Sequence, residues 1–293
     1  MTRRPIFYAL LSLMIAGWTG NYIAGKIALE SLPPVLLYGA RVSMAGLLML
    51  PVYAWERRRA HSTWSRRDLP LLVTIGVFGV ALNQFLFVLG LSRTSVAHAS
   101  IFGNMTPMLV LLLAGARGTE RITPRKLAGV AVSLAGVVLL RALDSGPQGE
   151  ATFLGDFLTF SGALAFAIFT VLGKPTAKEY GSITVNTVAY VGGALALAPV
   201  TLWQAARFPL AAVPWTAWAA VFYMALFPSV VCYLIYYYAL AHMEASRLSA
   251  FNYLLPPLAM LMGIWFLGEH VTHWTILGAA VIFAGIYLVE RSR

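Results

Sequence analysis

The stretch ASIFGNMTPMLVLLLAG, residues 99–115, holds an asparagine and a proline inside a run that is otherwise apolar enough to lie in lipid. A second version of it, FNYLLPPLAMLMGIWFLGE, occupies residues 251–269. A shift of 149 positions aligns residues 102–140 with residues 251–289 without a gap, and phenylalanine, proline, glutamate, threonine and glycine positions coincide. Chance similarity between two apolar segments would not align these polar and kinking residues. The chain therefore contains an internal repeat.

Composition places both copies of the repeat in a membrane. Of the 293 residues, 59% are hydrophobic and 11% are charged, and the mean hydropathy is +0.76. A soluble domain carries about 25% charged residues, so this chain lacks the polar surface that a water-facing protein needs. Its apolar residues form long blocks, and about 20 helical residues cross a hydrocarbon core about 30 Å thick. Barrel strands instead alternate apolar and polar residues in segments of roughly ten, so we predict a polytopic helical membrane protein.

The apolar blocks divide into two sets of five. We predict one five-helix unit in residues 1–143 and a second in residues 152–290. Because five is an odd number, the two units must lie in opposite orientations. The predicted fold is an all-α polytopic membrane protein with ten transmembrane helices in two inverted-topology five-helix repeats. The predicted spans lie near residues 6–27, 34–55, 70–91, 95–116, 124–142, 153–173, 183–204, 214–239, 246–267 and 272–290.

The basic residues indicate how the chain is oriented. The formal net charge is +10, which is also a feature of nucleic-acid-binding proteins, but most lysines and arginines lie in short loops between the predicted spans. They gather on the side that holds the N-terminus, and cytoplasmic loops are the ones enriched in Lys and Arg. We therefore predict cytoplasmic N- and C-termini and no binding of nucleic acid. The first span also continues through Trp18 and Tyr22 without a cleavage pattern, which favours a retained helix over a signal peptide.

Several kinds of chemistry lack the residues that they need. Cys232 is the only cysteine, so the chain forms no intramolecular disulfide and has no thiolate cluster for a metal. No GxxxxGK[ST] motif is present, which excludes ATP as an energy source within this chain. No Asp or Glu stands at the centre of a predicted span, where a proton relay would place one. A facilitator therefore fits at least as well as a proton-coupled pump, and no cofactor or metal is predicted.

An inverted repeat is typical of secondary transporters, which bind substrate near the midplane between two units that rock to give alternating access. Pro107 and Pro256 each remove one backbone hydrogen bond from the repeated stretch. The carbonyls that they free belong to Gly103 and Asn252, and in lipid a free carbonyl must face protein or water. We predict that both prolines mark hinges beside a wet central cavity. The alternative is a kink that serves packing alone, with Asn104 bonded to a neighbouring helix.

Polar and aromatic side chains at membrane depth complete a candidate substrate site. Trp18 and Tyr22 share one helical face, and Tyr233 and Tyr237 share another. An interfacial aromatic belt is the alternative for such residues. The candidate substrate-binding residues are Trp18, Asn21, Tyr22, Asn83, His98, Phe102, Asn104, Tyr233, Tyr237 and Asn252.

Other polar residues inside the spans leave alternatives open. His98 lies one turn into the fourth span, where it either senses pH or bonds a backbone carbonyl, and we favour the carbonyl. Asn83 and Gln84 point about 100° apart on a helix, so we expect at most one of them to face the cavity. Arg41 lies about two turns into the second span and either snorkels to the outer surface or pairs with Glu30.

Three stretches resemble a known family. Residues 16–46, AGWTGNYIAGKIALESLPPVLLYGARVSMAG, resemble the first two helices of EamA-type carriers in the drug/metabolite transporter superfamily. Residues 118–140 resemble the end of their repeat, with GTE where leucine-glycine-glutamate is commoner, and residues 244–289 give the fuller pattern. The resemblance covers nearly the whole chain and is closest to YddG-type amino-acid exporters, through the WTGNY start and the aromatic faces. It implies ten helices in two inverted units, a cavity between them and export of small metabolites through the inner membrane.

The predicted function is a secondary transporter or facilitator of the bacterial inner membrane, not an enzyme, that exports amino acids, including aromatic and other hydrophobic ones. Export of drugs or other small metabolites is the alternative. A lipid-modifying enzyme is a remote one, because it needs a nucleophile–base pair or a metal cluster. The expected partners are a small-molecule substrate and the lipid bilayer, and the chain is a monomer or homodimer. The small residues of segments 127–139 and 277–288 serve helix packing or a dimer contact.

Overall fold

A computed structural model describes residues 4–59, 65–117, 123–143, 152–242, 252 and 254–290. Every regular element in these ranges is helical, which confirms the predicted all-α class. The first half contains α1 (Arg4–Leu29), α2 (Pro34–Arg59), the short η1 (Arg66–Asp68), α3 (Leu69–Gly76), η2 (Val77–Leu82), α4 (Asn83–Leu91), α5 (Val96–Gly103), α6 (Thr106–Ala116) and α7 (Pro124–Leu143). The second half contains α8 (Phe153–Tyr180), α9 (Ser182–Ala205), the short η3 (Leu210–Ala212), α10 (Trp215–Met224), η4 (Ala225–Val231), α11 (Cys232–His242), α13 (Leu255–Leu267) and α14 (His273–Glu290).

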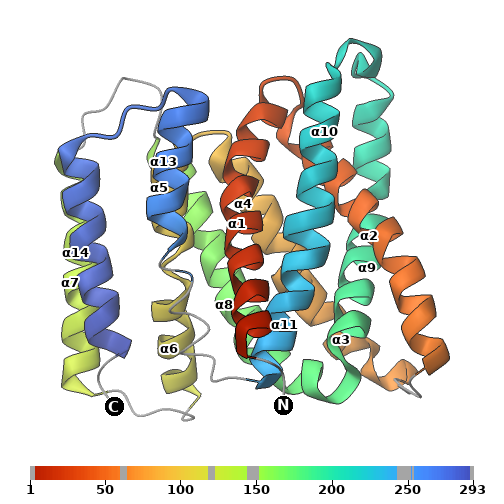
Figure 1. Ribbon diagram of the computed structural model, residues 1–293, viewed down its shortest axis with the longest axis horizontal. Coiled ribbons are helices and arrows are strands. Elements are labelled where there is room, and N and C mark those ends of the chain that lie inside the picture. The colour runs from red at the N-terminus through yellow and green to blue at the C-terminus, as the bar shows by residue number, and fades with distance from the viewer. Residues whose placement is uncertain are drawn as a thin grey trace.

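The helices coincide with the predicted spans (Figure 1). Six helical stretches in the described ranges are long and apolar enough to cross a membrane, and two shorter apolar helices follow them. The predicted spans at 70–91 and 214–239 each consist of two α-helices joined through a π-helix, and the span at 95–116 consists of α5 and α6. The first part of the span predicted at 246–267 lies outside the described residues. The chain is a polytopic helical membrane protein, as predicted.

Large apolar side chains cover the outside of the helices. Trp265, Phe153 and Leu195 expose 78%, 70% and 70% of their surface. Soluble monomers rarely expose large contiguous patches of such residues, whereas acyl chains solvate them without cost. The exposed apolar surface is therefore the face that meets lipid.

Two π-helices, which no pattern in the sequence predicts, occupy equivalent places in the two halves. η4 begins 148 positions after η2, and a π-helix leaves the regular α-helical hydrogen-bonding pattern. In the first half, the Tyr38 hydroxyl donates to the Ala81 carbonyl at 2.9 Å. In the second half, Asn186 Nδ2 donates to the Ser229 carbonyl at 3.4 Å. The donor and the acceptor of the second bond each stand 148 positions after those of the first. An equivalent bond therefore supports the π-helix in each half.

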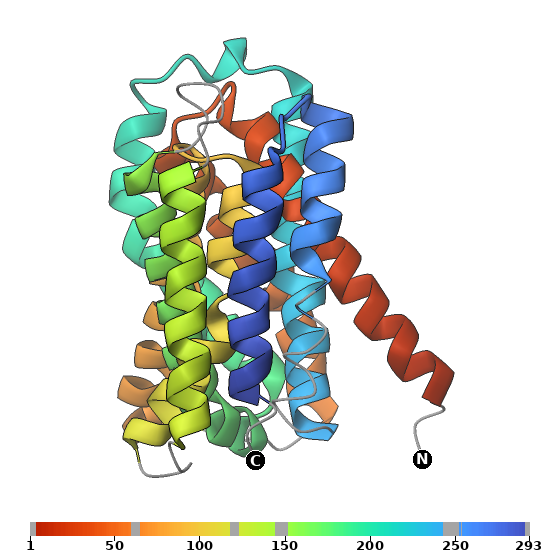
Figure 2. The ribbon, with the colours of Figure 1, turned by 90° about the vertical axis from the view of Figure 1, so that its left-hand side faces the viewer.

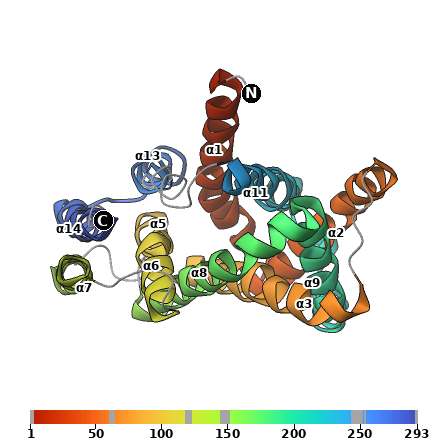
Figure 3. The ribbon, with the colours of Figure 1, turned by 90° about the horizontal axis from the view of Figure 1, so that it is seen from below.

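Equivalent helices of the two halves pair at both ends of the molecule. α7 packs along α14 at one end and α2 packs along α9 at the other (Figure 3). Figure 2 shows α7 and α14 side by side. A Cβ atom built on Gly136 would lie 3.1 Å from the Gly278 carbonyl oxygen, and one built on Gly285 would lie 2.5 Å from that of Gly129. The small residues predicted for packing or dimerisation are therefore used for packing within one chain.

Between these end pairs, each half packs its first helix against the other half. α1 contacts α10, α11 and α13, and α8, its counterpart, contacts α4 and α6. α11 and α13 in turn occupy the places in the second half that α4 and α6 occupy in the first. The centre of the molecule is thus built by helices of both halves (Figure 1).

Candidate functional site

The fourth span of the first half is broken at the asparagine–proline stretch. α5 ends at Gly103, and α6 begins at Thr106 with Pro107 as its second residue. Asn104 Nδ2 donates to the Ser100 carbonyl at 2.8 Å, which closes the last turn of α5. The Thr106 hydroxyl donates to the Gly103 carbonyl at 3.0 Å, so the chain itself satisfies the carbonyl that the proline frees.

The matching break in the second half is described in part. α13 begins at Leu255 with Pro256 as its second residue. Asn252, which precedes this helix, is buried. The role of Pro107 and Pro256 as hinges stays a prediction.

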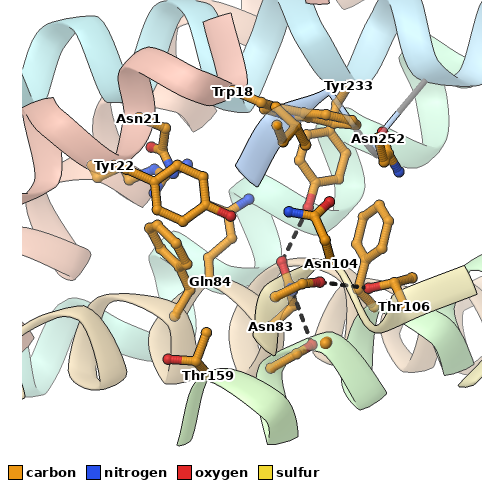
Figure 4. Close-up of a pocket in the computed structure, with 17 residues that line it drawn as sticks. Trp18, Asn21, Tyr22, Asn83, Gln84, Asn104, Thr106, Thr159, Tyr233 and Asn252 are labelled. Atoms are coloured by element: carbon orange, nitrogen blue, oxygen red, sulfur yellow. Dashed lines mark hydrogen bonds between the residues drawn. The ribbon is translucent and has the colours of Figure 1, made fainter. Parts of the chain in front are cut away.

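The broken turn lines a cavity of about 120 Å³ (Figure 4). α1, α2, α4 and the α5–α6 turn of the first half contribute to its wall, as do α8, α11 and the start of α13. An inverted repeat predicts a site of this kind, between the two units. The lining residues are Trp18, Asn21, Tyr22, Arg41, Asn83, Gln84, Phe87, Gly103, Asn104, Thr106, Thr159, Gly162, Ala163, Phe166, Tyr233, Asn252 and Leu255.

Seven of the ten candidate substrate-binding residues line this cavity. They are Trp18, Asn21, Tyr22, Asn83, Asn104, Tyr233 and Asn252. The Trp18 ring meets those of Phe166 and Tyr233 edge-on, at centroid distances of 6.4 and 6.1 Å. Trp18 therefore belongs to an internal aromatic wall and not to an interfacial belt. Tyr22 extends from α1 toward Asn104 across the same space (Figure 4).

The amides of the cavity differ in their hydrogen bonding. Asn83 uses both ends of its amide, since Nδ2 donates to the Gly162 carbonyl at 3.0 Å and Oδ1 accepts from the Tyr233 hydroxyl at 3.3 Å. Asn21 and Asn252 are buried, yet their Oδ1 atoms have no hydrogen-bond partner within the described part of the chain. A buried acceptor without a partner is costly and calls for a ligand or water that satisfies it. Two such acceptors on one cavity favour a guest that donates hydrogen bonds.

Three candidate residues lie outside this cavity. His98 Nδ1 lies 3.1 Å from Asp156 Oδ2 with both side chains buried, so one side of the imidazole pairs with a carboxylate, a partner that neither alternative for His98 included. Phe102 lines a second cavity of about 190 Å³, whose wall is mostly apolar and is formed by α5, the α5–α6 turn, α7 and α8. Tyr237 lies one turn beyond the main cavity on α11 and packs on Phe169 at a centroid distance of 5.7 Å.

Arg41 belongs to the cavity, although the sequence analysis did not place it there. Its side chain is buried, with 2% of its surface exposed, and its Nε donates to Ser229 Oγ at 3.0 Å. It therefore does not snorkel, and Glu30, the predicted partner, is exposed at the end of α1. The signal was present, because ionisable residues inside spans are usually functional.

α4 presents a wider face to the cavity than expected. Asn83, Gln84 and Phe87 all line it, whereas the angle between adjacent residues predicted at most one of the two amides. Gln84 is also bonded to a neighbour, since its Nε2 donates to the Tyr190 hydroxyl. Lining the cavity and bonding another helix are therefore compatible for one side chain.

A second polar cluster joins four elements where α1 ends and where α5 and α8 begin. Lys26 Nζ donates to the Thr94 carbonyl at 2.6 Å, and Thr94 Oγ1 donates to Asp156 Oδ1 at 2.6 Å. Glu269, which follows α13, accepts the Val96 N–H at 2.8 Å. A carboxylate at this place satisfies a free amide of α5 and complements the dipole of the helix.

A family model described as "EamA-like transporter family" matches residues 3–142 and, separately, residues 153–291. The chain belongs to the EamA-like transporter family. This membership confirms the predicted resemblance to carriers of the drug/metabolite transporter superfamily. It also agrees with the structure, in which a cavity lies between two helical halves.

Named relatives extend over nearly the whole chain. An "Uncharacterized transporter" of Archaeoglobus fulgidus is 31% identical over 289 residues, 98% of each chain. The "Uncharacterized inner membrane transporter YedA" of Escherichia coli strain K12 is 29% identical and covers 99% of this chain and 92% of its own. A "Probable terminal-alkyne amino-acid exporter" of Streptantibioticus cattleyicolor is 26% identical, with 96% and 92% covered. These transporter names favour transport over the lipid-modifying enzyme considered above.

A solved structure shares the fold. A chain described as "Crystal structure of protein" superposes with a TM-score of 0.65 at 20% sequence identity, covering 98% of this chain and 96% of the other. This likeness shows a shared fold and carries no information on substrate.

Proposed function

We propose that the protein exports amino acids, including aromatic and other hydrophobic ones, across the bacterial inner membrane. The observation that carries the proposal is the cavity between the halves, which combines an aromatic wall with buried amide oxygens that have no partner in the described chain. An amino acid offers an ammonium group to such oxygens and a side chain to such a wall.

The size of the cavity favours a small metabolite over a drug. Its volume is about 120 Å³, below the roughly 300–1,000 Å³ of pockets that hold drug-sized molecules. Larger amino acids need more room than this, so we expect the cavity to widen when one side opens. Trp18 of the first half and Phe166 of the second half, whose rings meet edge-on, would then form the apolar part of the site.

Two relatives support the two parts of the proposal. The exporter of Streptantibioticus cattleyicolor carries an amino-acid exporter's name, and the Escherichia coli relative carries that of an inner membrane transporter. The YddG-type likeness of the sequence agrees with both. We take the substrate class from this combination and not from any one relative.

We further propose that residues 1–143 and 152–290 act as two units that rock against each other. α1 and α8 each pack against the other unit, so rocking would change the packing on both sides of the cavity. The breaks near Pro107 and Pro256 offer places for the fourth span of each unit to bend. Alternating access of this kind needs no chemical step.

Uptake by liposomes that contain the purified protein tests the substrate class. We expect labelled amino acids to enter faster than into protein-free liposomes, and cationic drugs to compete weakly. Runs with and without a pH gradient separate a facilitator from a proton-coupled carrier. Ala163→Phe, which fills the cavity wall, serves as the blocked control if it keeps the melting temperature of the parent. Equal rates for all twenty standard amino acids and for empty liposomes would exclude the proposal.

The proposed orientation has both termini in the cytoplasm. Cys232 is the only cysteine, so Cys232→Ala gives a cysteine-free parent for labelling. Arg67, just before α3, and Ala211, between α9 and α10, are both exposed. The proposed orientation places Arg67 on the cytoplasmic side and Ala211 on the opposite side. In intact cells we expect a membrane-impermeant maleimide to label Ala211→Cys and to spare Arg67→Cys until the cells are opened. The reverse pattern would overturn the orientation.

A further inference from the structure

We propose that Arg41 binds the carboxylate of the substrate, so that the cavity selects molecules that carry a carboxylate and excludes those that carry only a positive charge. This inference rests on the proposed function and names the group that recognises the acid end of the substrate.

Arg41 is a buried cation that has no counter-ion within the described part of the chain. Its side chain is 2% exposed, and Nη1 has no hydrogen-bond partner among the described residues. Within those residues no carboxylate pairs with it. The titratable groups close enough to interact with its charge are the hydroxyls of Tyr38, Tyr190 and Tyr233 and the thiol of Cys232.

Such an arrangement is costly unless an anion completes it. Removing a charge from water carries a large penalty, which a partner of opposite charge must offset. A guanidinium presents its N–H groups as a planar fork that matches a carboxylate. Since Arg41 lines the cavity, a guest in the cavity is placed to supply that carboxylate.

The other unpaired atoms of the cavity complement this charge. Asn21 Oδ1 and Asn252 Oδ1 are acceptors that lack donors in the described chain, and both residues line the same space as Arg41. A guest with a carboxylate for Arg41 and an ammonium group for the amides satisfies all three. An α-amino acid has this pattern of groups.

The internal repeat shows that the scaffold does not need an arginine here. Position 41 corresponds to Ala189 in the second half, at the offset of 148 that also relates the two π-helices. Ala189 is buried on α9, the counterpart of α2. Asn21 likewise corresponds to Phe169, which is packed in the core. Arg41 and Asn21 therefore have no polar counterpart in the second half, so neither belongs to the repeated framework.

A purely structural role for Arg41 would use the bond to Ser229. That bond engages Nε alone and joins α2 to η4, which come from different halves. Ser229→Ala removes this acceptor and keeps the guanidinium, so it separates the structural contact from the charge.

Three matched probes test the inference: L-leucine, 4-methylpentanoate, which lacks the ammonium group, and 3-methylbutylamine, which lacks the carboxylate. Binding to the purified protein in detergent is measured by isothermal titration calorimetry. We expect the parent to bind leucine and 4-methylpentanoate more tightly than the amine. Arg41→Gln should weaken both carboxylates about 10- to 100-fold, as expected for hydrogen bonds to a charged group. Arg41→Lys should lose less, and Ser229→Ala less than about threefold.

The outcomes separate this inference from the proposed function. If the amine binds as well as the carboxylates, or if Arg41→Gln binds them as the parent does, Arg41 does not recognise the carboxylate, whether or not amino acids are transported. If 4-methylpentanoate binding depends on Arg41 but liposomes carry no amino acid, the inference holds and the proposed function fails. Failure of the parent to bind either carboxylate would also overturn it. If Arg41→Gln does not fold, the test rests on the affinity of Arg41→Lys for the carboxylates and on the preference of the parent for carboxylates over the amine.

Discussion

Ser133 donates a hydrogen bond of 3.0 Å from its hydroxyl to the carbonyl oxygen of Ile282, the residue that stands 149 positions later and occupies the same place in the repeat. Equivalent residues can meet in this way only where the axis that relates the two halves passes between them. The axis therefore runs between α7 and α14, which run in opposite directions (Figure 1). Ser133 donates and Ile282 accepts, so the two halves play different parts in this hydrogen bond.

Gly285→Ala should destabilise the protein at this axis. The added Cβ would lie 2.5 Å from the Gly129 carbonyl oxygen and still closer to the Ser133 backbone nitrogen, so α7 and α14 must move apart. Overpacking of this kind lowers the free energy of unfolding by about 1–3 kcal/mol. Thermal unfolding in detergent, followed by circular dichroism, measures the change.

The control is Gly192→Ala on α9, where nothing lies within 4 Å of the added Cβ. There the better helix propensity of alanine should leave stability equal or raise it by up to about 1 kcal/mol. Equal melting of the two variants would show that the glycines do not set the approach of α7 to α14.

Tyr38→Phe should weaken the first π-helix. The hydroxyl donates to the Val80 and Ala81 carbonyls at 2.8 and 2.9 Å, and its loss leaves both in a buried place. The expected cost is about 1–3 kcal/mol. Tyr236→Phe is the matched control, because that buried hydroxyl has a single partner among the described residues, Thr170, at 3.4 Å. If both variants unfold at the same temperature, the π-helix does not depend on Tyr38.

Much of the fold could be predicted because long apolar blocks and proline positions are visible in the sequence. The repeat was equally visible, since Pro107 and Pro256 align at one offset with glutamate and glycine residues. The π-helices were not, because the residues of η2 and η4 are as apolar as those of an α-helix and carry no distinct period. Side chains that bond the widened turns from other helices, among them Tyr38 and Asn186, mark the π-helices in the structure.

The site was harder to predict than the fold. In a membrane helix the lipid-facing and protein-facing sides are both apolar, so periodicity does not tell which side is inward. Phe102 and Tyr237 were taken for cavity residues because they lie near true ones, yet they face other parts of the core. His98 could not be assigned because its partner, Asp156, lies 58 residues away. Arg41 neither snorkels to the outer surface nor pairs with Glu30, the two alternatives that the sequence offered. Its burial depends on a cavity that several helices form, which the sequence does not show.

Glu269 should hold the start of α5 against the end of α13. Its carboxylate accepts the N–H groups of Val96 and Ala97 at 2.8 and 3.4 Å, linking the end of α13 to the start of α5. Losing a cap of this kind costs about 0.5–2 kcal/mol, which makes local opening roughly 2- to 30-fold more frequent. In a Cys232→Ala background, Ala97→Cys is buried, and Glu269→Ala should speed its reaction with a maleimide by such a factor.

The neighbouring His270 is exposed and provides the control for this measurement. His270→Ala should leave the rate of labelling unchanged. A rate that does not rise in Glu269→Ala, or that rises equally in both variants, would show that the carboxylate does not hold α5 in place.

Asn21→Leu should stabilise the protein while it impairs transport. The Oδ1 atom of Asn21 is buried without a partner in the described chain, so an apolar side chain of similar size removes a penalty of about 1–3 kcal/mol. The same change removes an acceptor that we propose for the ammonium group of the substrate. Asn83→Leu should act in the opposite direction on stability, because it breaks the bonds to Gly162 and Tyr233. Melting temperatures and leucine uptake are measured on both variants in parallel. Sites that bind ligands commonly keep such strained or unsatisfied groups at the expense of stability, so a lower melting temperature for Asn21→Leu would mean that its amide serves the framework and not the substrate.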